Sequence, residues 1–577
     1  MNNFRPCLLP LILSTVLCLL GARPAQAGSA TWQLDPTNGD WTFPANWMPD
    51  TVPNDPADTA TFAISNQRAV SVRGEIEVDK IRFEPGASVF TLDAVGNGRM
   101  TLSGDGIANN SGSVQSFRTV GEVEGDYPSI RFLNSATAGT DLEITNTATG
   151  SGPQTGFFDD SNAGEAVIVN EGATGRNGGA GLVDFNDNAS AANSTIMNFG
   201  AGLTFGSPGV CIFDGNSTAG NSTIINLPGV GGGINQTDFR ASANAGNATI
   251  LTFGSDSRAG TGSQTTFHVN SAANAIMIND GGTAPNAGGG TTIFFGGTAE
   301  NGTLIANPGT DGGLGGRISF FYKSSSGGTA RAQLFGNGTL DFTGREGPSL
   351  TIGSIEGDGI VLLGSNTLKV GGNGLSTEFS GVVKGDGALV KTGPGTLTLS
   401  GANTYVGGTK VRQGILILDS KVGFATGTGS VAVDSKGILT GRGDIAGALT
   451  VGLGTGGRPG LRPGIKGIGR LNVQGDLTMG VNGVYFWSPS PSAMQPGEIA
   501  ALGVTIENGA IFSASIHPDL ALPLGAVFTA IRNTATTSIA GEFANLPDGS
   551  TLTVGLNKFL VDYGGGDGND LTLTVVP

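Results

Sequence analysis

The chain contains 577 residues, of which 100 are glycine and only 13% are charged. A helical protein is excluded because glycine destabilises a helix interior by about 1 kcal/mol relative to alanine, and collagen is excluded because no Gly-X-Y period runs through the chain. The 29 phenylalanines and a hydrophobic share of 38% can supply a core, which argues against general disorder. A net charge of −16 disfavours nucleic acid and anionic membranes as partners, since both attract basic surfaces. Composition therefore predicts an acidic, glycine-rich, all-β protein.

Residues 1–27 have the pattern of a signal peptide. Arg5 supplies a positive charge, residues 8–20 form an apolar run, and Ala25-Gln26-Ala27 matches a cleavage site. We expect cleavage after Ala27 and export of the mature chain to the extracellular space or the cell surface. No later run reaches the roughly 20 apolar residues of a membrane helix, so we expect no integral membrane span after cleavage.

Cleavage would leave Cys211 as the single cysteine. One cysteine cannot form an intramolecular disulfide, so stability must come from a large repetitive core. Cys211 lies two residues before Phe213 and therefore on the same face of a strand, which predicts that it is buried in that core.

Residues 28–95 are predicted to form an N-terminal β cap. They contain three of the four tryptophans, namely Trp32, Trp41 and Trp47. A solenoid needs such a cap because an open end exposes strand edges and core. The alternative is that the tryptophan cluster stacks on sugar rings.

Residues 96–345 contain two ladders of residues with a common period. The first ladder consists of Phe132, Phe158, Phe185, Phe213, Phe239, Phe267, Phe294 and Phe320. The second follows an aliphatic pair in each unit and consists of Asn146, Asn170, Asn198, Asn226, Thr252, Asn279 and Asn307. The fold class predicted is all-β, a parallel β-helix (solenoid) with about 27–28 residues per coil. In such a coil, phenylalanines stack inside and asparagines form a second stack at a corner, each bonding its copy in the next coil.

Residues 346–480 are predicted to continue the solenoid, and residues 481–577 to form a C-terminal β region and cap. The pentapeptide at 355–359 has a counterpart at 383–387, 28 residues later, which predicts an unchanged period. Strands such as 396–400 now alternate cleanly between apolar and polar residues.

One segment of this region carries a family resemblance. The pattern K-T-G-x-G-x-L-x-L-x-G-x-N-x-Y-x-G-x-T is present at residues 391–409. Residues 388–418 closely resemble the autotransporter-associated β-strand repeat, also called the passenger-associated transport repeat. The resemblance implies a right-handed β-helix at the surface of a Gram-negative-type cell. Members end in a membrane β-barrel, and we expect none in the 159 residues after Leu418, so the resemblance does not imply self-translocation.

The outer face beside the phenylalanine ladder is the candidate site for enzymatic chemistry. The residue after each ladder phenylalanine is Asp159, Asn186, Asp214, Arg240 or His268, and such residues point outward. Asp214, Arg240 and His268 could act as acid, cation and base on this face, as in β-helical polysaccharide lyases and hydrolases. The alternative is a solvated edge where the chain enters its turn.

A second candidate site lies near the C-terminus, where residues 565–570 resemble a calcium-binding nonapeptide with Asp567 and Asp570 as ligands. That motif works in tandem copies, and a single copy favours a tight turn. We expect no metal and no cofactor.

The function predicted from these patterns is a secreted or cell-surface β-helix protein with a non-enzymatic structural, adhesive or ligand-presenting role. The alternative is a carbohydrate-active enzyme, a polysaccharide lyase or glycoside hydrolase, on the same scaffold. Polysaccharide or other cell-surface components are the expected partners.

Overall fold

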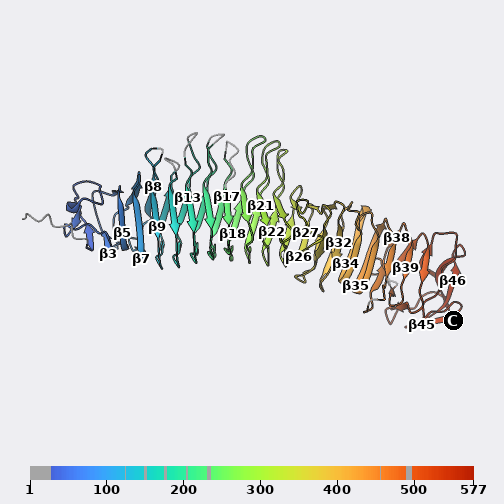
Figure 1. Cartoon of the computed structure of the whole chain (residues 1–577). Helices are drawn as coiled ribbons and strands as arrows, with labels where there is room; N and C mark the ends of the chain where they lie inside the picture. The colour runs from blue at the N-terminus through green and yellow to red at the C-terminus, as the bar shows by residue number, and fades with distance from the viewer. Residues whose placement is uncertain are drawn as a thin grey trace, which may run out of the picture.

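The computed structural model describes residues 28–123, 125–147, 152–174, 179–202, 206–229, 236–454, 456–488 and 497–577. The predicted signal peptide lies outside the described residues. The chain winds into one long rod, a parallel β-solenoid of about 18 turns (Figure 1). In the ranges described, the only helix is the three-residue 3₁₀ segment η1 (Pro44–Asn46), so the all-β prediction is confirmed. None of the described segments forms a helix with the length and hydropathy needed to cross a bilayer.

Sixteen strands form one sheet along the rod, called sheet 1 below. Their order is β2 (Trp47–Met48), β1 (Ala30–Trp32), β3 (Asp55–Phe62), β5 (Glu75–Phe83), β7 (Arg99–Asn109), β9 (Ser129–Phe132), β11 (Gln154–Phe157), β13 (Leu182–Phe185), β15 (Val210–Phe213), β17 (Gln236–Phe239), β19 (Gln264–Phe267), β21 (Thr291–Phe295), β23 (Arg317–Phe321), β25 (Thr339–Asp341), β28 (Ile360–Leu362) and β31 (Val382–Lys384).

The second strand of each coil belongs to a second paired face, called sheet 2. Over the N-terminal half it contains β4 (Ala69–Val72), β6 (Thr91–Val95), β8 (Gln115–Val120), β10 (Leu142–Asn146), β12 (Val167–Asn170), β14 (Thr195–Asn198), β16 (Thr223–Asn226), β18 (Thr249–Thr252), β20 (Ile276–Asn279), β22 (Thr303–Ala306), β24 (Arg331–Leu334) and β27 (Ser354–Gly357).

The C-terminal part of the rod continues the same pairing. Its remaining strands are β26 (Ser349–Ile352), β29 (Thr367–Val370), β30 (Thr377–Phe379), β32 (Ala388–Lys391), β33 (Thr396–Leu399), β34 (Thr409–Phe424), β35 (Val431–Ile445), β36 (Leu449–Val451), β37 (Gly460–Pro463), β38 (Arg470–Val473), β39 (Leu477–Met479), β40 (Val484–Trp487), β41 (Glu498–Ala501), β42 (Val504–Ile506), β43 (Ile511–Ala514), β44 (Val527–Asn533), β45 (Thr551–Val554), β46 (Asn557–Gly565) and β47 (Asp570–Val576).

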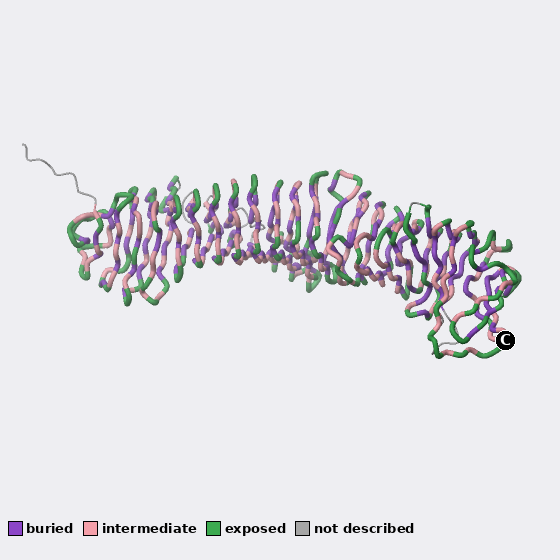
Figure 2. The backbone as a smooth tube through the Cα atoms, turned by 90° about the horizontal axis from the view of Figure 1, so that it is seen from below, coloured by how far each residue is buried: buried purple, intermediate pink, exposed green. Residues whose placement is uncertain are grey.

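Most strands alternate between buried and partly exposed residues, because successive side chains of a strand point to opposite faces (Figure 2). In β14, for example, Ile196 and Asn198 are buried while Thr195 and Met197 face outward. Parallel pairing then places like residues on like residues, as where Phe185 of β13 pairs with Phe213 of β15.

The predicted phenylalanine ladder forms the core of sheet 1, with one correction. Neighbouring rings lie parallel, with centroids 4.5–4.9 Å apart, from Phe132 to Phe320. Phe157, rather than the predicted Phe158, occupies the ladder, because it pairs with Phe132 and Phe185 in strand register. Phe158 lies on the outer face, where the Arg131 guanidinium sits 4.7 Å from its ring centroid.

The predicted asparagine ladder is a buried hydrogen-bonded column. The Nδ2 atom of each residue donates to the Oδ1 atom of the next, at 2.8 Å from Asn146 to Asn170, 2.7 Å from Asn170 to Asn198 and 2.8 Å from Asn198 to Asn226. Threonine hydroxyls from sheet 1 add to it, as where Thr237 donates to Asn226. Asn307 was wrongly predicted as a member, because the strand register pairs Asn279 with Ala306.

A third, exposed column of asparagines runs along the turn before sheet 2. Each member donates its side-chain N–H to the carbonyl oxygen of the previous one at 3.0–3.3 Å. The column consists of Asn193, Asn221, Asn247, Asn274 and Asn301.

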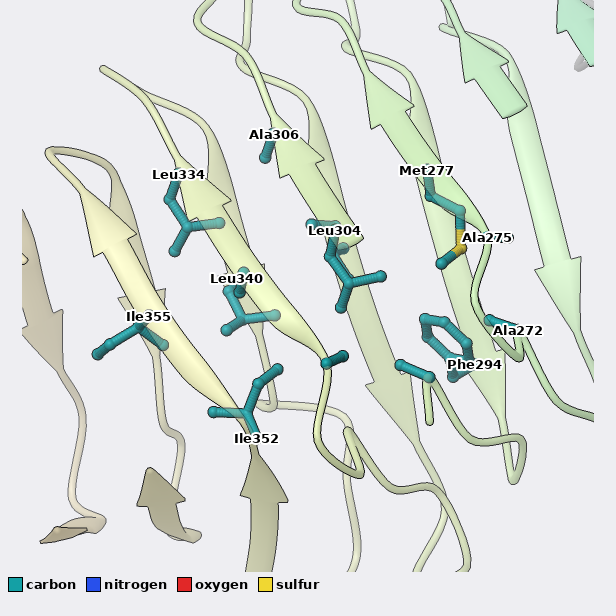
Figure 3. Close-up of a cluster of buried hydrophobic side chains, with 14 of the residues drawn as sticks. Ala272, Ala275, Met277, Phe294, Leu304, Ala306, Leu334, Leu340, Ile352 and Ile355 are labelled. Carbon is teal, nitrogen blue, oxygen red and sulfur yellow. The ribbon is translucent and has the colours of Figure 1, made fainter. Parts of the chain in front are cut away.

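The coil length changes where the prediction expected it to stay constant. Phe185 and Phe213 are one coil and 28 residues apart, but Thr339 pairs with Ile360, and Ile360 with Val382, so these coils take 21 or 22 residues. The similar pentapeptides at 355–359 and 383–387 are therefore not one coil apart. The coils are shorter because the connection from sheet 2 to sheet 1 shortens from residues 307–316 to residues 335–338. Inside, the phenylalanine column continues from Phe320 to Phe342, with ring centroids 5.5 Å apart, and aliphatic side chains such as Leu340 and Ile355 fill the core beside it (Figure 3).

Both ends of the rod carry antiparallel strands. At the N-terminus β1 pairs antiparallel with β2, and Trp32, Trp41 and Trp47 are at most 1% exposed. Their indole N–H groups donate to backbone carbonyls of Gln67, Pro53 and Trp41 respectively. The rings are thus inaccessible, and the alternative of a sugar-stacking tryptophan cluster is wrong. At the C-terminus β44 to β47 pair antiparallel.

Lys391, the lysine of the repeat motif, is buried with 1% of its surface exposed. Its Nζ atom donates to the backbone carbonyls of Thr392, Gly393 and Gln413 at 2.7, 2.9 and 3.1 Å. Burial lowers the pKa of this ammonium from 10.5 to about 8. The lysine therefore joins the turns of two successive coils.

We expect Phe239→Ala to lower the free energy of unfolding by about 3–5 kcal/mol, because it removes a fully buried ring and leaves a cavity between two stacked neighbours. Chemical denaturation of the variant and of the parent measures the loss. Phe199→Ala is the matched control, since Phe199 is 38% exposed and should lose much less. Equal losses for the two variants would contradict the inward assignment of Phe239.

Asn198→Ala should lower the free energy of unfolding by about 1–3 kcal/mol, because it leaves the buried Asn170 and Asn226 amides without one partner each. Asn221→Ala removes a link of the exposed column, where water replaces the lost bonds, and should cost no more than about 0.5 kcal/mol. The same denaturation measurement compares the two. A larger effect at Asn221 would show that the outer column, not the inner one, stabilises the coils.

Stability should rise with pH between about 8 and 10 through Lys391. In this window the folded lysine, with its lowered pKa, has released its proton while the unfolded one still binds it, so the unfolding free energy increases with pH. The difference in unfolding free energy between the parent and Lys391→Met isolates this contribution from that of other groups. A difference that stays flat or falls from pH 8 to pH 10 would contradict the assignment.

Candidate functional site

The outer face of sheet 1 brings together charged residues from neighbouring coils. Asp238 in β17 lies between Arg240, whose Nε atom is 2.7 Å from Oδ2, and His268, whose Nε2 atom is 3.0 Å from Oδ1. Asp238 is 2% exposed, whereas the side chains of Arg240 and His268 are each 46% exposed. The Arg240 guanidinium thus donates a hydrogen bond to Oδ2, and the His268 ring covers Oδ1, which accepts no hydrogen bond from the described residues.

Of the three predicted catalytic residues, Arg240 and His268 contact the same carboxylate, that of Asp238, whereas Asp214 does not. Asp214 follows Phe213 on the outer face, but its Oδ1 atom accepts a hydrogen bond of 2.7 Å from the backbone N–H of Gly215. Asp159 was predicted in the same column and lies outside it, because Phe157 and not Phe158 faces the core. Phe158 takes the place of Asp159 beside Asn186.

A second carboxylate, which is partly buried, lies two coils nearer the N-terminus. Asp184 accepts hydrogen bonds of 2.9 Å from the Gln154 amide and 2.7 Å from the Asn186 amide. Burial raises the pKa of Asp184, an effect that these two hydrogen bonds and the charge of Arg131 oppose. Asn186 therefore acts as a fixed hydrogen-bond donor on this face.

A long groove runs along the outer face of sheet 1 toward the C-terminal part of the rod. Two cavities of about 510 Å³ and 440 Å³ share Gly288, Gly289, Thr291, Leu314 and Arg317, so they are continuous. The first begins at Gln264 and includes Phe321, and the second extends to Lys384. Six strands, from β19 to β31, form the floor.

The candidate calcium ligands near the C-terminus have different surroundings. Asp570 is fully buried, its Oδ1 atom accepts a hydrogen bond of 2.9 Å from the Asn533 backbone, and Arg532 lies 3.8 Å from its Oδ2 atom. Asp567 is exposed. Over the described ranges, no three His, Cys, Asp or Glu side chains come together as metal ligands. Asp570 is instead positioned to join β47 to the end of β44.

Two further reactive side chains in the sequence are Cys211 and His517. Cys211 is fully buried in the core of β15, as predicted, and burial raises the pKa of its thiol well above the usual value. His517 is exposed near the C-terminal cap.

Sequence reasoning missed Asp238 and the groove for different reasons. Asp238 lies two residues before Arg240 and therefore on the same outer face, a relation visible in the strand pattern once both flanks of each ladder phenylalanine are considered. The groove depends on where the glycine-rich loops fold, and no residue pattern in the chain indicates that.

Comparison with known proteins supports the resemblance seen in the sequence. The family model described as Passenger-associated-transport-repeat matches residues 389–418, which span β32, β33 and part of β34. The adhesin BmaC autotransporter of Brucella suis biovar 1 (strain 1330) is 38% identical over 98 residues, which cover 17% of this chain and 3% of that protein. An extracellular serine protease of Serratia marcescens is 41% identical over 100 residues, covering 17% of this chain and 8% of that protein.

The chain thus spans only a small part of the length of these relatives. The matched repeat forms consecutive coils of the rod, because β32 pairs with β29 on one side and β34 on the other. Residues 389–418 are therefore a passenger-associated transport repeat that is built into a parallel β-solenoid.

Proposed function

We propose that the chain is a secreted or cell-surface β-helix rod with a non-enzymatic structural, adhesive or ligand-presenting role. The matched repeat and the names of the two relatives, an autotransporter adhesin and an extracellular protease, support location outside the cell. The repeat pairs with coils on both sides, so it acts as part of the rod.

One observation carries the non-enzymatic role. Asp238, the carboxylate that contacts both Arg240 and His268, is 2% exposed; Arg240 donates a hydrogen bond to Oδ2, and the His268 ring lies 3.0 Å from Oδ1. A general acid or base must reach a substrate proton directly or through one water. A carboxylate covered in this way suits the joining of two neighbouring strands.

The pair of Asp238 and His268 also supports a second candidate, a carbohydrate-active enzyme. The imidazole is half exposed on an open face, and a histidine oriented by a carboxylate is a common general base. Asp238 and His268 would then act as the orienting and proton-accepting groups, with Arg240 beside them on the same face.

A binding and turnover screen of the full chain against a panel of polysaccharides distinguishes the two candidates. We expect retention on one or more immobilised polysaccharides with no new reducing ends and no unsaturated products. Protease treatment of intact producing cells tests the location, because a surface-exposed rod is cleaved without cell lysis.

His268→Gln and Asn221→Ala serve as the site variant and its control in the turnover assay. Cleavage of a polysaccharide that disappears in His268→Gln and persists in Asn221→Ala would establish the enzyme instead. A chain found only inside cells would contradict the proposed surface role.

A further inference from the structure

The groove on sheet 1 has the shape of a site for a long, chain-like ligand. It follows the rod axis over six strands, β19, β21, β23, β25, β28 and β31. At about 4.8 Å per strand step, this length is about 24 Å. Its ends lie on an open face, so a polymer could enter and leave at both.

One wall of the groove is a stack of three loops, at residues 253–263, 280–290 and 307–316 (Figure 1). Backbone hydrogen bonds join each loop to the next, for example from Ser255 N to Gly288 O at 2.8 Å and from Gly282 N to Leu314 O at 2.8 Å. Gly289 permits this approach, since a Cβ atom there would lie 2.2 Å from the carbonyl oxygen of Gly315. The wall is therefore preformed, which reduces the entropy lost on binding.

The opposite side of the groove carries aromatic rings. His268, Phe295 and Phe321 follow one another in the outer column beside the phenylalanine ladder, with ring centroids 6.0 and 5.1 Å apart. Tyr322 lies 5.9 Å from Phe295 and is 58% exposed. Phe321 itself lines the groove. Because these rings stack on one another, they present their edges to the groove as an apolar strip, against which the apolar faces of sugar rings can pack.

The floor carries polar side chains and two positive charges. Gln264, Thr291 and Ser319 present amide and hydroxyl groups, and the two charged residues among the lining residues are Arg317 and Lys384. Arg317 pairs with the buried Asp341, whereas Lys384 is exposed at the end of the groove. In a chain of net charge −16, a groove whose charged lining residues are both basic favours an anionic ligand.

We propose that this groove binds an extended acidic polysaccharide, with sugar rings against Phe321 and carboxylate or sulfate groups near Arg317 and Lys384. A peptide strand is disfavoured because strands β21 to β28 are already paired on both edges, which leaves no edge for strand addition. The inference rests on the proposed ligand-presenting role and names its ligand.

The test uses the purified full chain and two probes, polygalacturonate as the acidic polymer and dextran as the neutral one. Affinity electrophoresis and biolayer interferometry at low and high salt measure binding. We expect binding to polygalacturonate that weakens with salt, because salt screens exposed charges, and weaker binding to dextran. Phe321→Ala and Lys384→Gln should each weaken polygalacturonate binding about fivefold or more.

Matched substitutions outside the groove control for general effects. Lys369→Gln changes an outward lysine of β29, which pairs with β26 and β32 and not with sheet 1, and Phe199→Ala changes an exposed phenylalanine after β14. Both should bind as the parent does, and all four variants should keep the parent's thermal midpoint, since each side chain is at least partly exposed.

Each other outcome overturns the proposal in a different way. Polygalacturonate binding that Phe321→Ala and Lys384→Gln leave unchanged would place the ligand elsewhere and leave the proposed function intact. Equal affinity for dextran at all salt concentrations would contradict an acidic ligand. If the parent chain is exposed on cells but binds neither polymer, the proposed ligand of the groove is wrong and the proposed surface role stands. If the chain is absent from the cell surface, the proposed function is wrong.

Discussion

Each coil of the rod hydrogen-bonds through its backbone to the coil before it and the coil after it, and this parallel pairing places like side chains on one another. Phe213 lies on Phe185 and under Phe239, and Asn198 lies between Asn170 and Asn226. Stacked rings and linked amides gain energy only while the register is kept. The same residues would be unfavourable if one coil slipped by a residue, since every inward side chain would then face outward.

The same strand register also aligns side chains and loops on the outer surface. Arg240 reaches Asp238 within its own coil and His268 approaches the same carboxylate from the next coil, because the columns of sheet 1 stay aligned. The loops at 253–263, 280–290 and 307–316 align for the same reason and form a wall. Where the connection shortens to residues 335–338 the wall ends, while the floor continues to β31. The change in coil length therefore shapes the groove that we propose as a binding site.

Lys391 illustrates how a motif of the transport repeat acts within this architecture. Its ammonium is buried at a point where two successive turns present three backbone carbonyls, and it hydrogen-bonds to all of them. Gly414 lies close enough that a Cβ atom there would be 2.8 Å from Nζ. A glycine at this position of the neighbouring coil therefore leaves room for the lysine side chain, and the motif stabilises the contact between coils.

The sequence by itself determined the all-β solenoid, the two ladders and the burial of Cys211, because residues that recur once per coil must stack in a one-dimensional repeat. It did not determine whether Phe157 or Phe158 faces the core, since both fit the approximate period and only the pairing with Phe132 and Phe185 selects one. It also missed the contact of Asp238 with His268, the shortened coils after β24 and the groove. These features depend on the paths of glycine-rich loops between the strands, where no side-chain period constrains the backbone, and only the packing of one coil on the next decides them.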